Sequence, residues 1–185
     1  QILERKAAVA EDATGGFFYR TYRKKFAIIR MISTGFDAWA KAQLGGMDMF
    51  AIIVGTHGRL AEELLSSVEM IFGEVQNTAA VTFLPGEGPA DITAKYEAVL
   101  EKLDTSGGVL FLVDIFGGTP YNAACRIVIN NEQYGIVTGV SMPMLVDMAN
   151  TQALDEGTDI RALMEKAASV GQKGIRLFHA SAVNS

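Results

Sequence analysis

Four short apolar runs, separated by stretches with helical periodicity, constrain the fold of this chain more than any other feature. The runs are Met49–Val54 (MFAIIV), Ala79–Leu84 (AAVTFL), Gly108–Val113 (GVLFLV) and Tyr134–Val140 (YGIVTGV). Continuous apolar runs rich in β-branched residues are typical of strands that are buried on both faces. Their alternation with helical segments predicts an α/β fold with a doubly wound, mostly parallel sheet.

The segment after the first run has the periodicity of an amphipathic helix. Its apolar residues recur at spacings of three and four: Leu60, Leu64, Val68, Ile71 and Phe72. These residues define one apolar helical face, and Gly73 is a plausible end for the helix.

Proline and threonine mark the starts of the next two helices. Pro89 lies near the first turn of a helix expected over residues 89–103, where proline is favoured. After the third run, Thr119 is the expected N-cap and Pro120 the expected first helical residue. We therefore expect one helix before the third strand in the sequence and one helix after it.

The C-terminal part of the chain completes the pattern. Two further helices are expected over residues 141–152 and 159–174. They are followed by IRLF (Ile175–Phe178), which we expect to be a short last strand at a sheet edge.

The charge of the chain is divided between two regions. The 185 residues carry a net charge of −5 and are enough for one domain with a sizeable core. Residues 1–46 carry eight basic and four acidic side chains, a net of +4, so residues 47–185 carry −9. We therefore expect an N-terminal extension of uncertain structure over 1–46, dispensable for the main chemistry, and a domain over 47–185.

The basic cluster YRTYRKKFAIIR in this extension leaves several interpretations open. It could contact nucleic acid or an acidic membrane surface, be a solvated arm, or precede a natural start at Met47 or Met49. We do not expect a nucleic-acid partner for the domain itself.

Several classes of protein are disfavoured by what the sequence lacks. No apolar stretch reaches the roughly 18 residues of a membrane helix. The single cysteine, Cys125, permits no internal disulfide, and a cytoplasmic setting fits best. No zinc-like spacing, GxxxxGK[ST] loop or GxGxxG motif after the first run is present, so we expect no metal and no nucleotide cofactor.

His57, in the stretch GTHG, is the first candidate for chemistry. It follows the first strand and precedes a helix, whose positive end favours anions, including a phosphoryl group on the imidazole. Gly55 and Gly58 leave room for the backbone or a partner to approach. The alternative is an ordinary structural or surface histidine.

The loop DIFGGTP after the third strand supplies complementary groups. Asp114 lies at the same end of the sheet as His57, and it can fix the tautomer of the ring if the two strands are neighbours. Gly117, Gly118 and Thr119 can present backbone N–H groups to an oxyanion. The alternatives are that Asp114 caps its own loop and that the glycines form a simple turn. Together these residues predict an anion site with a nucleophile and an orienting carboxylate.

Four segments resemble the IIA component of the mannose-type (mannose/fructose/sorbose) sugar phosphotransferase system. They are FAIIVGTHGRLAEELLSSVEMIFG, FLPGEG, GVLFLVDIFGGTPYNAA and GVSMPML. The resemblance runs from about Met47 to near the C-terminus, and the motifs occur in the family's order.

This resemblance implies a phosphocarrier. In the family, a histidine matching His57 accepts phosphate from the protein HPr and passes it to a histidine of a IIB component. The orienting aspartate matches Asp114, the loop around the phosphoryl group matches Gly117 and Gly118, and Thr119 stands where the family often has serine.

The resemblance also implies partners and an assembly. The family fold has an antiparallel edge strand that is exchanged in a homodimer, a role that the segment GIRLF could fill. The membrane components IIC and IID would be reached only indirectly. Residues 1–46 have no counterpart in the family, and no IIB domain follows in this sequence, so we expect the acceptor to be a separate polypeptide.

Two other functions remain open from the sequence. The protein could be a regulatory phosphohistidine module that is not coupled to transport. It could also be a small-molecule enzyme that uses His57 and Asp114 as a general base pair.

Overall fold

The apolar runs of the sequence form the strands of one parallel sheet. The computed structural model describes residues 49–154 and 159–179, so the basic extension over 1–46 lies outside the described residues. The strands are β1 (Ala51–His57), β2 (Thr78–Phe83), β3 (Val109–Val113) and β4 (Tyr134–Thr138). They are hydrogen-bonded in the order β2-β1-β3-β4, and every pair is parallel. The predicted α/β fold is confirmed.

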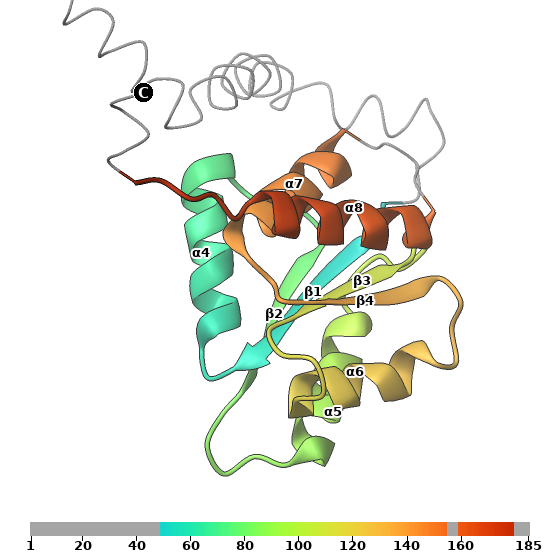
Figure 1. Cartoon of the computed structure of the whole chain (residues 1–185). Helices are drawn as coiled ribbons and strands as arrows, with labels where there is room; N and C mark the ends of the chain where they lie inside the picture. The colour runs from blue at the N-terminus through green and yellow to red at the C-terminus, as the bar shows by residue number, and fades with distance from the viewer. Residues whose placement is uncertain (1–48, 155–158, 180–185) are drawn as a thin grey trace, which may run out of the picture. The chain divides into compact units, whose positions relative to one another are not determined.

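Helices cover both faces of this sheet. They are α4 (Leu60–Phe72), α5 (Pro89–Leu100), α6 (Thr119–Val128), α7 (Met142–Ala153) and α8 (Ile160–Lys173). Figure 1 shows α5 and α6 on one face and α4, α7 and α8 on the other. In the described part of the chain, no helix is both long and apolar enough to cross a bilayer.

The two helical layers explain why the strands are apolar throughout. Successive side chains of a strand point to opposite faces. Accordingly, Ile52 and Leu110 belong to the core beneath α4, α7 and α8, whereas Ile53 and Phe111 belong to the core beneath α5 and α6. All four side chains are almost completely buried. The side chains of β1 and β3 that lie between the two cores are therefore mainly apolar, and the buried Thr56 near the end of β1 is an exception.

The strand order creates a switch point between β1 and β3. The chain leaves β1 through α4 on one face of the sheet and leaves β3 through α6 on the other. The loops after these neighbouring strands therefore diverge, and such a divergence is where ligands bind in open α/β sheets. His57 ends β1, and Asp114 directly follows β3.

Two local expectations need correction. Gly118, in an extended conformation, is the N-cap of α6, and Thr119 is already the first helical residue. The expected apolar face of α4 is correct at Leu64, Val68 and Phe72, which contact the core, but Leu60 and Ile71 are exposed. Gly73 ends α4 as expected, with a positive φ of 95°.

The expected last strand at Ile175–Phe178 does not form within the single described chain, and its exchange with a second copy stays a prediction. Residues 175–179 form neither helix nor strand. A strand needs an adjacent edge to supply its hydrogen bonds, and a β-prone sequence alone does not provide one. The described sheet is thus parallel throughout and ends at β2 and β4.

Candidate functional site

His57 and Asp114 meet at the carboxyl edge of the sheet. Nδ1 of His57 lies 2.9 Å from Oδ2 of Asp114, and the backbone N–H of His57 donates to the same oxygen at 2.9 Å. The other carboxylate oxygen accepts a hydrogen bond from the N–H of Ile115. Because a carboxylate only accepts hydrogen bonds, the contact places the ring proton on Nδ1 and leaves the lone pair on Nε2.

The Nδ1 side of the His57 ring contacts the protein, whereas part of the ring is exposed to solvent. Its side chain is 40% exposed, whereas that of Asp114 is 12% exposed. The ring also packs edge-on against Phe83, with centroids 5.6 Å apart. β1 continues to His57, three residues beyond the run expected from sequence, because β1 pairs with β2 up to the His57–Phe83 pair. The ring is therefore anchored by two neighbouring strands.

The free edge of the imidazole lies over the start of α6. A methyl group on Gly118 would lie 2.8 Å from Cε1 and 3.5 Å from Nε2 of His57. Gly117 has a positive φ of 76° and turns the chain into the helix. Within the described part of the chain, the N–H groups of Gly117 and Thr119 donate to no other group, while that of Gly118 donates to Ile115 at 3.3 Å. Free N–H groups at a helix N-terminus favour an anion beside Nε2.

Asn122 supports this loop from within α6. Its side-chain nitrogen donates to the carbonyl of Gly117 at 2.8 Å, and its backbone N–H donates to that of Gly118 at 2.9 Å. Sequence analysis missed Asn122, because an asparagine in the first helical turn matches no motif by itself. Only its contact with the loop assigns it to the site.

Thr56, the residue before His57, caps the start of α4. Its buried hydroxyl accepts a hydrogen bond from the N–H of Ala61 at 2.7 Å, across five residues. This bond satisfies one of the free donors at the start of α4 in place of an N-cap side chain. Sequence analysis missed this role as well, since cap signals are sought next to the helix rather than inside the preceding strand.

Tyr96 of α5 lies beneath the site and is completely buried. Its hydroxyl donates to the carbonyl of Pro120 at 3.2 Å. Burial, and to a smaller extent the negative charge of Asp114, raises the pKa of Tyr96 well above its ordinary value. The hydroxyl is therefore a permanent hydrogen-bond donor at neutral pH.

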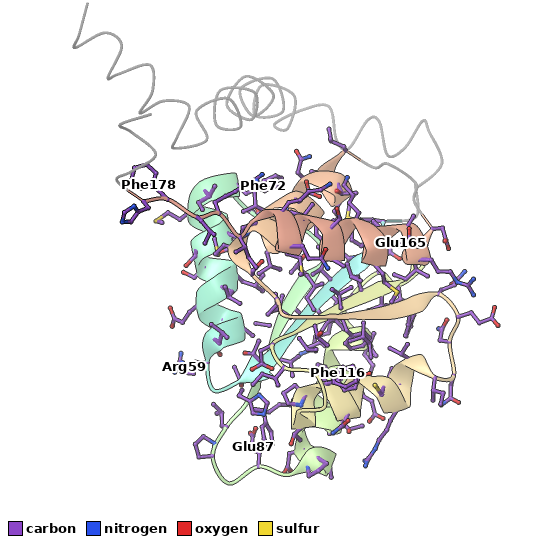
Figure 2. The ribbon with its side chains drawn as sticks, viewed as in Figure 1. Arg59, Phe72, Glu87, Phe116, Glu165 and Phe178 are labelled. Carbon is purple, nitrogen blue, oxygen red and sulfur yellow. The ribbon has the colours of Figure 1, made fainter. Side chains whose placement is uncertain are left out.

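Polar and apolar side chains from three loops lie at the edge of the molecule where β1, β2 and β3 end. Figure 2 shows Arg59, Glu87 and Phe116, from the segments that follow β1, β2 and β3, around this edge of the molecule. Nε of Arg59 lies 2.9 Å from a carboxylate oxygen of Glu62. Phe116 is 74% exposed and contacts Tyr121 with ring centroids 4.8 Å apart. Across residues 49–154 and 159–179, no group of three or more potential ligands is arranged for a metal ion.

Comparison with known proteins identifies the family. Residues 51–167 match the family model described as "PTS system fructose IIA component". The chain belongs to this family. The matched segment contains all five site residues proposed from sequence: His57, Asp114, Gly117, Gly118 and Thr119.

Named relatives and a solved structure agree with this assignment. The chain is 44% identical over 133 residues to the mannose-specific EIIAB component of Escherichia coli, covering 72% of this chain and 41% of that protein. This family member thus spans about two fifths of that relative's length. It is 35% identical over 129 residues to the fructose-specific EIIA component of Bacillus subtilis, covering 70% of this chain and 86% of that protein.

The mannose/sorbose-specific IIA subunit from Enterococcus faecalis has a similar solved structure. The TM-score is 0.62 at 28% identity, and the match covers 71% of this chain and 96% of that one. The resemblance read from the four sequence segments is therefore confirmed.

Proposed function

We propose that this PTS IIA protein is a phosphohistidine carrier that accepts a phosphoryl group from phosphorylated HPr and passes it to a IIB component. The observation that supports this most directly is the 2.9 Å contact between Nδ1 of His57 and Asp114. It leaves Nε2 as an exposed nucleophile beside the N-terminus of α6.

The proposed step is an in-line transfer between two imidazoles. The lone pair of Nε2 of His57 attacks the phosphorus atom, and the N–P bond to the donor histidine breaks as the new N–P bond forms. The proton on Nδ1 stays in its hydrogen bond to Asp114, which stabilises the positive charge that develops on the ring. Transfer to the acceptor is the same step in reverse.

The start of α6 supplies the electrostatic part of the proposed mechanism. The free N–H groups of Gly117 and Thr119 can donate to the phosphoryl oxygens, and the hydroxyl of Thr119 is a further donor in the same turn. In phosphoryl transfer, positioning and charge stabilisation account for most of the catalysis. No metal or nucleotide is required of this chain, because the phosphoryl group arrives already activated on a histidine.

The proposal extends to the assembly. We infer that the chain works as a homodimer that contacts HPr and IIB directly and the membrane components IIC and IID only through IIB. The exposed apolar side chains of Ile175, Leu177 and Phe178 support an interface with a second copy.

The mass of the intact protein tests the carrier function. The chain is incubated with phosphoenolpyruvate, Enzyme I and HPr, in parallel with the His57→Ala variant. We expect the gain of one acid-labile phosphoryl group, which the variant does not acquire. No gain in the presence of active HPr, or an equal gain in the variant, would refute the proposal.

A further inference from the structure

Tyr96 connects three elements that meet below the site. It belongs to α5, and its ring packs edge-on against Phe111 of β3, with centroids 5.3 Å apart. Its hydroxyl reaches the carbonyl of Pro120, the second residue of α6. Helices α5 and α6 pack against each other, and this hydroxyl adds a hydrogen bond from α5 to the first turn of α6.

Gly55 makes space for that hydroxyl. It lies on β1, two residues before His57. A methyl group on Gly55 would overlap the Tyr96 hydroxyl and would lie 2.8 Å from Cζ of the ring. The backbone of Gly55 is ordinary strand, so the neighbouring tyrosine, not the conformation, excludes a side chain here. The hydroxyl is thus inserted between the strand that carries the histidine and the helix that carries the anion donors.

The bond to Pro120 acts at a sensitive point of α6. Pro120 is buried and lies two residues after Gly118, over which the free edge of His57 rests. A shift of the first turn of α6 would therefore change the distance between Nε2 and the N–H groups of Gly117 and Thr119. A misplacement of about 1 Å can slow an enzyme reaction by about 100-fold.

We propose that the Tyr96 hydroxyl is a positioning group that fixes the start of α6 against β1 and so sets the distance between His57 and the phosphate-binding N–H groups. The inference rests on the proposed carrier function. Tyr96 does not touch the phosphoryl group, and it acts through Pro120 and the loop that precedes it. The raised pKa of Tyr96 is consistent with this role, because the hydroxyl remains a donor throughout the neutral range.

The test compares two tyrosine-to-phenylalanine variants in the full chain. Tyr96→Phe keeps the ring and removes the hydroxyl. Tyr134→Phe is the matched control, because Tyr134 contacts the same Phe111 ring but lies at the start of β4, away from the site. The rate of phosphorylation by phosphorylated HPr is measured as a function of HPr concentration, together with the thermal unfolding of each variant.

We expect Tyr96→Phe to lower the limiting rate at least tenfold while leaving the half-saturating HPr concentration within twofold of wild type. Tyr134→Phe should leave both values within twofold. A limiting rate for Tyr96→Phe equal to that of the control would overturn the inference. So would a change in the half-saturating concentration alone.

Gly55→Ala provides a second, independent perturbation if Tyr96→Phe does not fold. The added methyl displaces the hydroxyl while the tyrosine remains, so we expect the same loss of limiting rate. Where both variants fold, the double variant should be little slower than either single one, because both changes break the same bond. Fully additive losses, or a normal rate in Gly55→Ala, would contradict the inference. Failure of the wild-type chain to take up phosphate would instead refute the carrier function itself.

Discussion

At the scale of single residues, Asp114 controls the proton on His57. Its Oδ2 accepts from both the ring and the backbone N–H of His57, and its Oδ1 accepts from Ile115. We predict that Asp114→Asn slows phosphorylation on the order of 100-fold, because an amide no longer enforces the Nδ1–H tautomer or stabilises a positive ring. Quenched-flow sampling with intact-mass detection measures the rate. A loss smaller than threefold would show that Asp114 does not orient the ring.

Gly118 is the residue whose substitution should separate activity from stability. Its φ of −68° is open to any residue, so alanine there carries no backbone strain. The methyl group would nevertheless lie 2.8 Å from Cε1 of His57 and displace the ring. We predict a loss of phosphorylation rate of at least tenfold with the thermal midpoint nearly unchanged.

Gly73→Ala is the matched control for this prediction. Gly73 has a φ of 95° at the end of α4, and an added methyl group would contact no other residue. Alanine there should cost on the order of 1–3 kcal/mol of stability through backbone strain, because this φ/ψ region is open almost only to glycine, while leaving the rate unchanged. If Gly118→Ala instead behaved like Gly73→Ala, with lower stability and an unchanged rate, the contact with His57 would not control the reaction.

At the scale of secondary-structure elements, the loop after β2 is fastened to α5 by an ion pair. Oε1 of Glu87 lies 2.6 Å from Nζ of Lys95, which also donates to the carbonyl of Thr82. The N–H of Leu84 donates to the other oxygen of Glu87. The bond from Leu84, and then the bond from Lys95, holds the pKa of Glu87 below its ordinary value of 4.5.

Because the pKa of Glu87 is lowered, the contribution of its interactions to the stability of the native state depends on pH. A carboxyl whose pKa falls on folding stabilises the native state above its unfolded pKa, and that contribution is lost as the pH falls through the folded value. We therefore predict that Glu87→Gln is less stable than wild type at pH 7 and that the difference shrinks below pH 4.5. Urea unfolding midpoints of both proteins between pH 7 and pH 3 provide the measurement. A difference that does not vary with pH would contradict the assignment.

The strands and helices could be predicted from the sequence, but the residues at which they begin and end were predicted less accurately. Continuous apolar runs located β1 to β4, because a strand between two helical layers is apolar on both sides. The start of α5 followed from Pro89, whereas Thr119 was placed one residue outside α6. Roles that depend on a contact across the fold, such as the Thr56 hydroxyl capping α4, leave no trace in the local sequence.

At the scale of the whole molecule, strand order decides whether the site exists. The sequence placed His57 and Asp114 at the same sheet edge, but their contact depended on β1 and β3 being neighbours. The order β2-β1-β3-β4 makes them so, although β2 separates them along the chain. Strand order is set by helix packing on the two faces rather than by any single segment. The sequence therefore predicted the contact between His57 and Asp114 only on the condition that the first and third strands are neighbours.

The strand expected over residues 175–178 also depends on a neighbouring strand, and it has none within the described chain. Ile175, Leu177 and Phe178 are 76%, 98% and 70% exposed, an unfavourable arrangement for three large apolar side chains. β4 is one of the two outer strands of the described sheet, and one of its edges has no neighbouring strand. Both features favour strand pairing with a second copy of the chain.

We predict that wild type is a dimer at micromolar concentration and that Leu177→Asp is a monomer, because a charge on a pairing strand cannot be buried. Sedimentation equilibrium measures the mass of each. Met70→Asp is the matched control, since Met70 is a similarly exposed apolar residue, at 83%, on α4. The monomeric variant should still be phosphorylated, because His57, Asp114 and the start of α6 all come from one chain. A monomeric wild type, or a dimeric Leu177→Asp, would mean that this segment does not form the interface.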